Sequence, residues 1–181
     1  MTLRRERFWF LRHGETDWNA QGLSQGNVDI PLNATGIAQA HAAAPLLRDR
    51  GIASIVASPL SRAHDTARVA GELLGLPVTL DEELRETSFG AQEGQPMVAW
   101  FSQWVEGSYT PPDAESFADL RVRAVAAVNR ALERPGLVLV VAHGALFRAL
   151  RAEMGLEANV RTRNAWPMLC EPGDPWRLTD A

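Results

Sequence analysis

Short apolar runs alternate along the chain with amphipathic stretches. Almost continuous apolar runs are typical of strands that are covered on both faces of a parallel sheet. The runs predict strands at 8–11, 52–57, 78–80, 137–142, 168–171 and 177–179. The Pro-Gly-Asp-Pro sequence between the last two predicts a turn, so these two strands are expected to form a terminal hairpin.

Helices are predicted between the strands. Residues 34–50 form one candidate helix, which Pro45 should kink or split because proline lacks an N–H donor. Ser58 precedes a proline, and this pair predicts the N-cap and first residue of a second helix that continues to Leu74. Arg62 would then lie in the first turn of that helix, close to the end of the preceding strand.

Two further helices are predicted at 117–132, where apolar residues recur at helical spacing, and at about 146–154. The segment 95–112 is aromatic and irregular, and is expected to be a short lid-like excursion. Strands that alternate with helices predict an α/β fold, a three-layer α/β/α sandwich with a mostly parallel central sheet. We expect residues 1–181 to form a single domain.

The composition limits which partners the chain can bind and which side chains could hold a phosphate group. The net charge of −4 provides no general positive field for nucleic acid or an anionic membrane. All 18 basic residues are arginine, so a phosphate group would have to be held by guanidinium groups, whose rigid fork suits phosphate oxygens. No apolar run approaches the length of a membrane span, and Cys170 alone cannot form an internal disulfide. A cytoplasmic protein is expected.

Two of the predicted strands, 8–11 and 137–142, are followed by histidine and glycine. Parallel strands end at the same edge of a sheet, so Arg12, His13, Arg62 and His143 should meet there. Guanidinium forks, imidazoles and free backbone N–H groups together suit a dianion. A metal site built from the two histidines and Glu15 is the alternative, and the neighbouring arginines argue against it.

The motifs also resemble those of the histidine phosphatase superfamily, the phosphoglycerate-mutase-like enzymes. The matches are Arg-His-Gly-Glu-Thr-x-x-Asn at 12–19, Ser-Pro-Leu-x-Arg-Ala-x-x-Thr-Ala at 58–67, Leu-x-Glu at 84–86, Phe-Gly-x-x-Glu-Gly at 89–94, Glu-Ser at 115–116 and His-Gly at 143–144. They occur in the family's order along nearly the whole chain. The resemblance implies a phosphoglycerate-mutase-like fold.

The resemblance also implies roles for single residues. His13 would attack phosphorus and become phosphohistidine, while Arg12, Arg62 and His143 would bind the transferring oxygens. Glu86 would protonate the leaving alkoxide and then deprotonate water, with Glu82, Glu83 and Glu93 as rivals for this role. Asn19, Gln25 and Gly144 are expected to bind substrate, although Asn19 could equally be a turn residue.

The leading hypothesis is a phosphomonoester hydrolase that requires neither metal nor cofactor and acts through phosphohistidine on a small phosphorylated metabolite. Inorganic phosphate or sulfate is expected to occupy the same site. The alternatives are a phosphoglycerate-type mutase and a catalytically silent phospho-ligand binding module. The segment 95–112 has no basic residue for a substrate carboxylate, which favours the phosphatase. Ala145 and Ser88 depart from the family pattern and leave the choice of substrate open.

Overall fold

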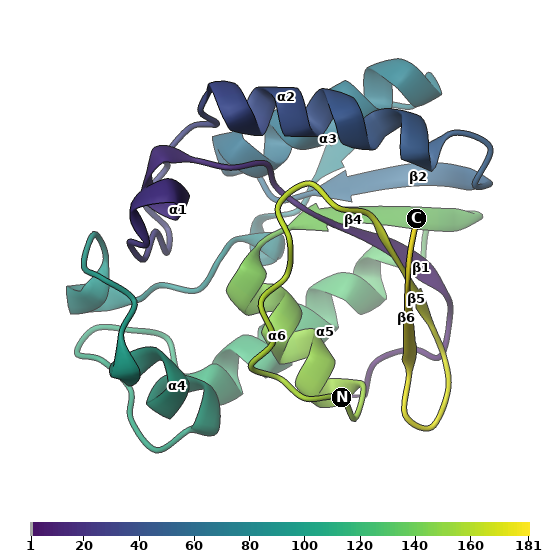
Figure 1. The fold of residues 1–181 in the computed structure, drawn as a ribbon. Coiled ribbons are helices and arrows are strands. Elements are labelled where there is room, and N and C mark those ends of the chain that lie inside the picture. The colour runs from purple at the N-terminus through teal and green to yellow at the C-terminus, as the bar shows by residue number, and fades with distance from the viewer. Residues whose placement is uncertain (1) are drawn as a thin grey trace.

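The computed structural model describes residues 2–181, which form one six-stranded sheet flanked by helices (Figure 1). The strands are β1 (Phe8–Arg12), β2 (Ile52–Ala57), β3 (Val78–Leu80), β4 (Leu137–Ala142), β5 (Met168–Glu171) and β6 (Arg177–Asp180), arranged in the order β3-β2-β4-β1-β5-β6. The first four run parallel, and β5 and β6 form the predicted antiparallel hairpin. The prediction of a mostly parallel sheet is therefore confirmed.

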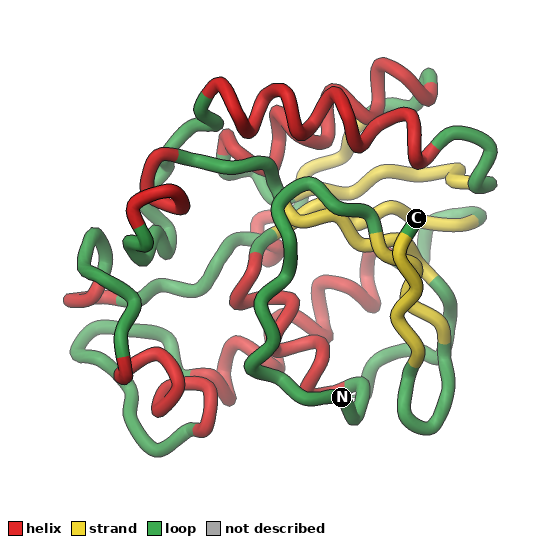
Figure 2. Tube along the Cα trace, in the orientation of Figure 1, coloured by secondary structure: helices red, strands yellow, loops and turns green. Residues whose placement is uncertain are grey.

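Helices cover both faces of the sheet, as the three-layer prediction requires. They are α1 (Asp17–Gln21), α2 (Ala34–Ala43), α3 (Ser61–Leu74), α4 (Ala99–Glu106), α5 (Phe117–Ala131) and α6 (Gly144–Glu153). Three short 3-10 turns occur at Ala44–Leu47, Glu82–Leu84 and Gly90–Gln92. Figures 1 and 2 show α2 and α3 on one face and α5 and α6 on the other.

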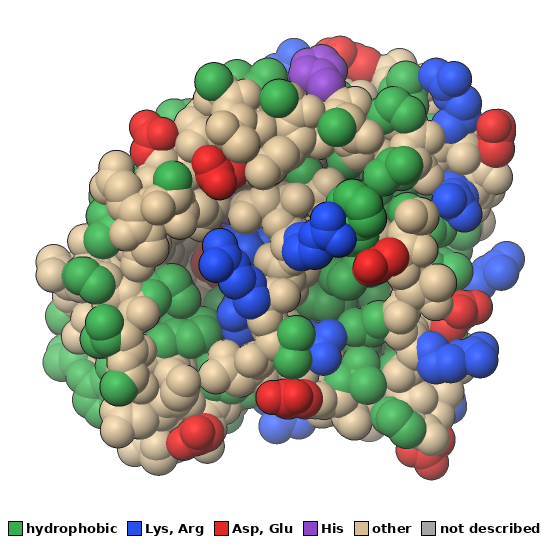
Figure 3. All heavy atoms as spheres, viewed as in Figure 1, with side chains coloured by type: hydrophobic (Ala, Val, Ile, Leu, Met, Phe, Trp, Pro, Cys, Tyr) green, Lys and Arg blue, Asp and Glu red, His purple; other side chains and the backbone are tan. Residues whose placement is uncertain are grey.

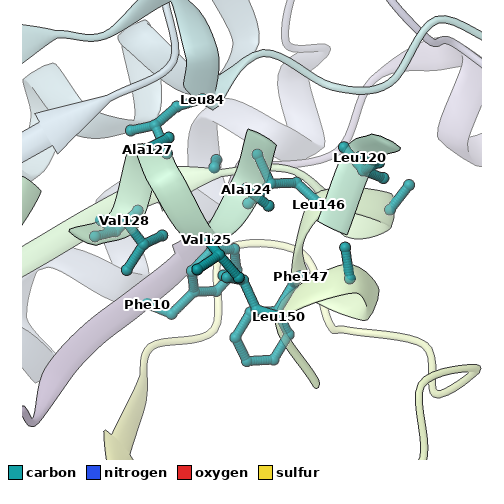
Figure 4. Close-up of a cluster of buried hydrophobic side chains, with 14 of the residues drawn as sticks. Phe10, Leu84, Leu120, Ala124, Val125, Ala127, Val128, Leu146, Phe147 and Leu150 are labelled. Atoms are coloured by element: carbon teal, nitrogen blue, oxygen red, sulfur yellow. The ribbon is translucent and has the colours of Figure 1, made fainter. Parts of the chain in front are cut away.

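Alternation along β1 divides the apolar core between the two faces. Phe8 and Phe10 face α5 and α6, and the Phe10 ring stacks on Phe147 with a centroid separation of 4.1 Å (Figure 4). Trp9 and Leu11 point the other way, into the cluster beneath α2 and α3. Because both faces of β1 are buried, the residues that follow it have a fixed position at the edge of the sheet.

The register brings the carboxyl ends of three parallel strands together. Arg12 lies opposite Ala142 on β4, and the other neighbour of β4 is β2. The pairing continues past the strand ends, since His13 N donates to Ala142 O at 3.0 Å and Ser58 N donates to Val141 O at 3.0 Å. Polar residues from three distant parts of the sequence therefore meet at one edge.

Pro45 splits the predicted 34–50 helix: α2 ends at Ala43 and a 3-10 turn follows. The predicted cap at Ser58 is wrong, because α3 begins three residues later, at Ser61. The Ser58 hydroxyl accepts from Leu60 N, ahead of the helix, and is also hydrogen-bonded to His143, while the carboxylate of Asp29, from a remote loop, accepts from Ser61 N at 2.8 Å. A cap supplied from 32 residues away leaves no local signal in the sequence.

Two other boundaries differ from prediction. α6 begins at Gly144, two residues earlier than expected, with His143 as its N-cap residue. The segment 95–112 is not irregular throughout, because α4 occupies its centre. Its aromatic residues have helical spacing, and Trp104 is fully buried against the rings of Phe101 and Phe117. Among residues 2–181, no helix is both long enough and apolar enough to cross a membrane.

Replacing Trp104 tests whether α4 is an integral part of the core. Trp104→Ala should lower the free energy of unfolding by about 3–5 kcal/mol, the usual cost of removing a buried indole. Tyr109→Ala, at a partly exposed ring just beyond the same helix, should change it by less than about 1 kcal/mol. Urea unfolding of both variants makes the measurement, and equal effects would contradict the assignment.

Candidate active site

A small cavity opens at the carboxyl edge of the sheet, on the hollowed face seen in Figure 3. Its volume is about 50 Å³, which leaves room for a few heavy atoms, such as a tetrahedral oxyanion. The residues that line it are Arg12, His13, Asn19, Leu23, Gln25, Gly26, Arg62, Glu86, Phe89, Met97, Phe101, Gly144, Ala145 and Arg148. The structure thus brings seven of the eight predicted site residues to the wall of one cavity, and the eighth, His143, lies beside His13.

The ring of His13 has a defined tautomer. Its Nδ1 atom lies 2.6 Å from the carbonyl oxygen of Gly14, and because a carbonyl only accepts, Nδ1 carries the proton. The Nε2 atom is therefore the unprotonated nitrogen. Burial, together with the positive charges of Arg62 and Arg12, holds the pKa of His13 well below 6.5. The imidazole consequently stays neutral at physiological pH, as a nucleophile must.

His143 lies beside His13, with the two ring centroids 5.2 Å apart. Its Nε2 atom shares a 2.7 Å hydrogen bond with the hydroxyl of Ser58, and its Nδ1 atom is buried with no partner among the described residues. Burial and the charge of Arg62 hold the pKa of His143 well below 6.5 as well. A neutral imidazole with one free ring nitrogen can donate to or accept from a bound group.

The two predicted phosphate-binding arginines are held by backbone carbonyls. Arg12 Nη1 donates to Thr162 O at 2.6 Å, and Arg62 donates to Val28 O and Gly26 O, both at 2.8 Å. Burial lowers the pKa of Arg12 to about 10, although the charge of Glu86 opposes this, and burial lowers the pKa of Arg62 too. Both groups remain cationic at neutral pH and keep their full charge for an anion.

Glu86 is fixed at the N-terminus of α6. Its two carboxyl oxygens accept from Ala145 N at 2.9 Å and from Leu146 N at 3.0 Å. Two of the N–H groups that lack partners within the helix at its N-terminus therefore hold both carboxyl oxygens in place. Glu82 and Glu83 are exposed, and Glu93 accepts from the backbone of Asn27 and Phe89, so only Glu86 of the four acids lines the cavity.

Asn19 and Gln25 line the cavity with their carboxamide oxygens already engaged. Asn19 Oδ1 accepts from Thr16 N and from the Asn164 side chain, and Gln25 Oε1 accepts from the Thr16 hydroxyl at 2.7 Å. Each amide therefore has its NH₂ group left to donate. Asn19 completes the cap of α1 and also lines the cavity, so its predicted contact with substrate stays a prediction.

Gly144 lies where a side chain would crowd the site. A Cβ atom there would be 3.3 Å from Arg12 Nε and 3.5 Å from Arg148 Nη1. The absence of a side chain lets two guanidinium groups approach the start of α6.

Sequence reasoning missed two polar groups. Ser58 was expected to cap a helix and instead binds His143. Arg148 lines the cavity four residues after Gly144, one helical turn along α6. Because residues four apart share a helix face, the position of Gly144 could have indicated it.

The remaining wall of the cavity is apolar, formed by Leu23, Phe89, Met97 and Phe101. Within residues 2–181, no cluster of three or more His, Cys, Asp or Glu side chains has the arrangement of a metal site. The site therefore combines guanidinium groups, an imidazole and one carboxyl group with a set of apolar side chains.

The lowered pKa values of the histidines predict a loss of stability in acid. Below pH 6.5 the unfolded chain binds protons at both imidazoles that the folded protein does not bind, so the free energy of unfolding falls as pH decreases. Two such groups should lower it by about 2–3 kcal/mol between pH 7.5 and 5.5. Urea unfolding in phosphate-free buffer measures the change, which a His13→Asn/His143→Asn double variant should largely abolish. Equal stability of the unmodified protein at the two pH values would contradict the prediction.

The chain was compared with known proteins. Residues 8–168 match the sequence pattern of the histidine phosphatase superfamily (branch 1). PhoE of Bacillus subtilis, named an uncharacterized phosphatase, is 40% identical over 147 residues, which cover 80% of this chain and 75% of that protein. A Yersinia pestis protein named probable phosphoglycerate mutase GpmB is 37% identical over 167 residues, 86% of this chain and 78% of that protein. The structure of a mycobacterial glucosyl-3-phosphoglycerate phosphatase superposes with a TM-score of 0.85 at 34% identity, covering 96% of this chain and 97% of that one. The chain belongs to the histidine phosphatase superfamily.

Proposed function

We propose that this protein is a phosphomonoesterase that hydrolyses a small phosphorylated metabolite through a phosphohistidine at His13. One observation carries the proposal: a neutral imidazole with a defined free nitrogen lines the same cavity as Arg12, Arg62 and Glu86. Relatives named as phosphatases support this reading. Neither step described below calls for a metal ion, since guanidinium groups supply the positive charge.

The first step transfers the phosphoryl group to the protein. The Nε2 lone pair of His13 attacks phosphorus, and the bond between phosphorus and the ester oxygen breaks. Arg12 and Arg62 bind the non-bridging oxygens, together with the NH₂ groups of Asn19 and Gln25. The carboxyl group of Glu86 gives its proton to the departing alkoxide, which leaves as an alcohol.

The second step returns the protein to its starting state. Water enters in place of the alcohol, and Glu86, now a carboxylate, removes a proton as the water oxygen attacks phosphorus. The P–N bond breaks, inorganic phosphate is released and the His13 lone pair is restored. His143 lies beside the reacting ring, where its free Nδ1 can bind an oxygen of the transferring group.

The walls of the cavity indicate the kind of alcohol that leaves. Besides its polar residues, the cavity is lined by the apolar side chains of Leu23, Phe89, Met97 and Phe101. A leaving group with an apolar or ring-containing part would bury surface against these side chains, whereas a strongly hydrated one would lose water without new partners. This supports a phosphomonoester with an apolar portion next to the phosphate.

A phosphoglycerate-type mutase is the second candidate, because one of the relatives is named a probable phosphoglycerate mutase. A mutase returns the phosphoryl group to an acceptor instead of to water. The apolar wall and the absence of basic residues from 95–112 favour the phosphatase. Turnover that requires a bisphosphate primer would favour the mutase.

His13→Ala is expected to abolish turnover, because His13 is the imidazole among the residues that line the cavity and His143 lies outside that lining. The assay is phosphate release from a panel of phosphomonoesters with a chelator present throughout. The unmodified protein should also form an acid-labile, base-stable phosphoprotein that the variant does not form. Retained activity in His13→Ala, or activity lost with the chelator, would refute the mechanism.

Glu86→Gln should slow hydrolysis by about 10²–10⁴-fold for an alkyl phosphate, whose alkoxide needs a proton to leave. The loss should be much smaller in phosphoenzyme formation from p-nitrophenyl phosphate, whose phenolate leaves without one. Single-turnover rates for both substrates make the comparison, and Glu83→Gln, at an exposed neighbouring acid, serves as the control. An equal loss for the two substrates would remove Glu86 from the role of acid.

A further inference from the structure

Arg148 is a buried cation that the proposed mechanism does not yet use. It lies on α6, the residue is 9% exposed, and it lines the same cavity as Arg12 and His13. Its Nη1 atom donates to Gly144 O at 3.2 Å, one turn back along the helix, and its Nε atom is buried without a partner among the described residues. A buried N–H donor without an acceptor costs about 1–3 kcal/mol and therefore requires an explanation.

The charges around the cavity are unbalanced. Three guanidinium groups, those of Arg12, Arg62 and Arg148, line it together with one carboxyl group, that of Glu86. None of the ion pairs found within residues 2–181 includes any of these three arginines. The surplus of positive charge in the cavity suits a phosphomonoester dianion.

Gly144 brings two of these cations together. Arg12 Nε and Arg148 Nη1 both lie within 3.5 Å of the point where a Cβ atom of residue 144 would be. The Nε atoms of both side chains are buried and have no hydrogen-bond partner within residues 2–181. Two like charges held this close, each with a free donor, are suited to share one anion.

The ring of Phe101 holds Arg148 from the other side. The guanidinium carbon lies 5.0 Å from the ring centroid, within the range of a cation–π contact. Phe101 belongs to α4 and also lines the cavity. The guanidinium group is therefore positioned between the start of α6, the apolar wall and the space that the substrate would occupy.

We propose that Arg148 is a third guanidinium ligand of the substrate phosphoryl group, next to Arg12 and on the side of the apolar wall. The proposal rests on the phosphatase function proposed above. Arg148 would contact an oxygen of the bound dianion through its free donors, and the Phe101 ring would fix its direction. Phosphate affinity then depends on a residue from α6 in addition to those that follow β1 and β2.

Isothermal titration with inorganic phosphate tests the assignment without relying on turnover. Arg148→Met keeps an unbranched side chain over Phe101 but removes the charge, and should weaken phosphate binding by about tenfold to a hundredfold, as expected for the loss of a charged hydrogen bond. Arg148→Lys should bind with intermediate affinity, because a single ammonium replaces the fork. Arg151→Met is the matched control on the same helix, since Arg151 donates to Glu157 O, away from the cavity.

A second measurement distinguishes a variant that lacks the guanidinium ligand from one that loses phosphate affinity because it folds poorly. Adding millimolar guanidinium ion to Arg148→Ala should restore part of the phosphate affinity, and a purely structural defect would not respond in this way. Phosphate affinity in Arg148→Met and Arg148→Lys equal to that of the Arg151→Met control would overturn the proposal. If the unmodified protein binds phosphate through Arg148 but hydrolyses no monoester, the phosphatase function fails while the Arg148 assignment stands.

Discussion

The active site depends on three buried guanidinium groups that backbone carbonyls hold at the carboxyl edge of the sheet. Arg12, Arg62 and Arg148 donate to carbonyl oxygens of the backbone, and none of them takes part in an ion pair within residues 2–181. A carbonyl orients a guanidinium group without cancelling its charge, whereas a carboxylate would do both. The fold thus fixes three cations and leaves their field directed into the cavity.

This arrangement costs stability. Burial is the main cause of the lowered pKa of all three arginines, which means that each charged form loses hydration in the folded protein. The apolar layers on both faces of the sheet offset this loss, with β1 and β4 almost completely buried. Binding of an anion would relieve the repulsion, so phosphate should stabilise the folded state as well as occupy the site.

Burial and the same field together determine the state of the two histidines. Burial is the main cause of their lowered pKa values, and the charges of Arg62 and Arg12 act in the same direction, so both imidazoles remain neutral. The hydrogen bond from His13 Nδ1 to Gly14 O then selects the nucleophilic nitrogen. Charge and tautomer are thus set by different contacts, one electrostatic and one local to the backbone.

Much of the site could be predicted because parallel strands end at a common edge. That rule placed Arg12, His13, Arg62 and His143 together from three short stretches of sequence, and the motif resemblance added Glu86 and Gln25. The rule could not find Asp29 at the start of α3, since a cap supplied across the fold depends on tertiary contacts. The hydrogen bond between Ser58 and His143 could not be predicted for the same reason, because the two residues are 85 positions apart in the sequence.

The start of α6 shows why such a site tolerates little change. His143 is the N-cap residue, Gly144 leaves space for two guanidinium groups, and the amides of Ala145 and Leu146 hold Glu86. A methyl group on Gly144 would press against Arg12, and a shift of the helix by one residue would release Glu86. One helical turn therefore fixes a cation, a carboxyl group and an imidazole relative to each other, and the buried packing of Phe147 against Phe10 on β1 ties that turn to the strand that ends in Arg12.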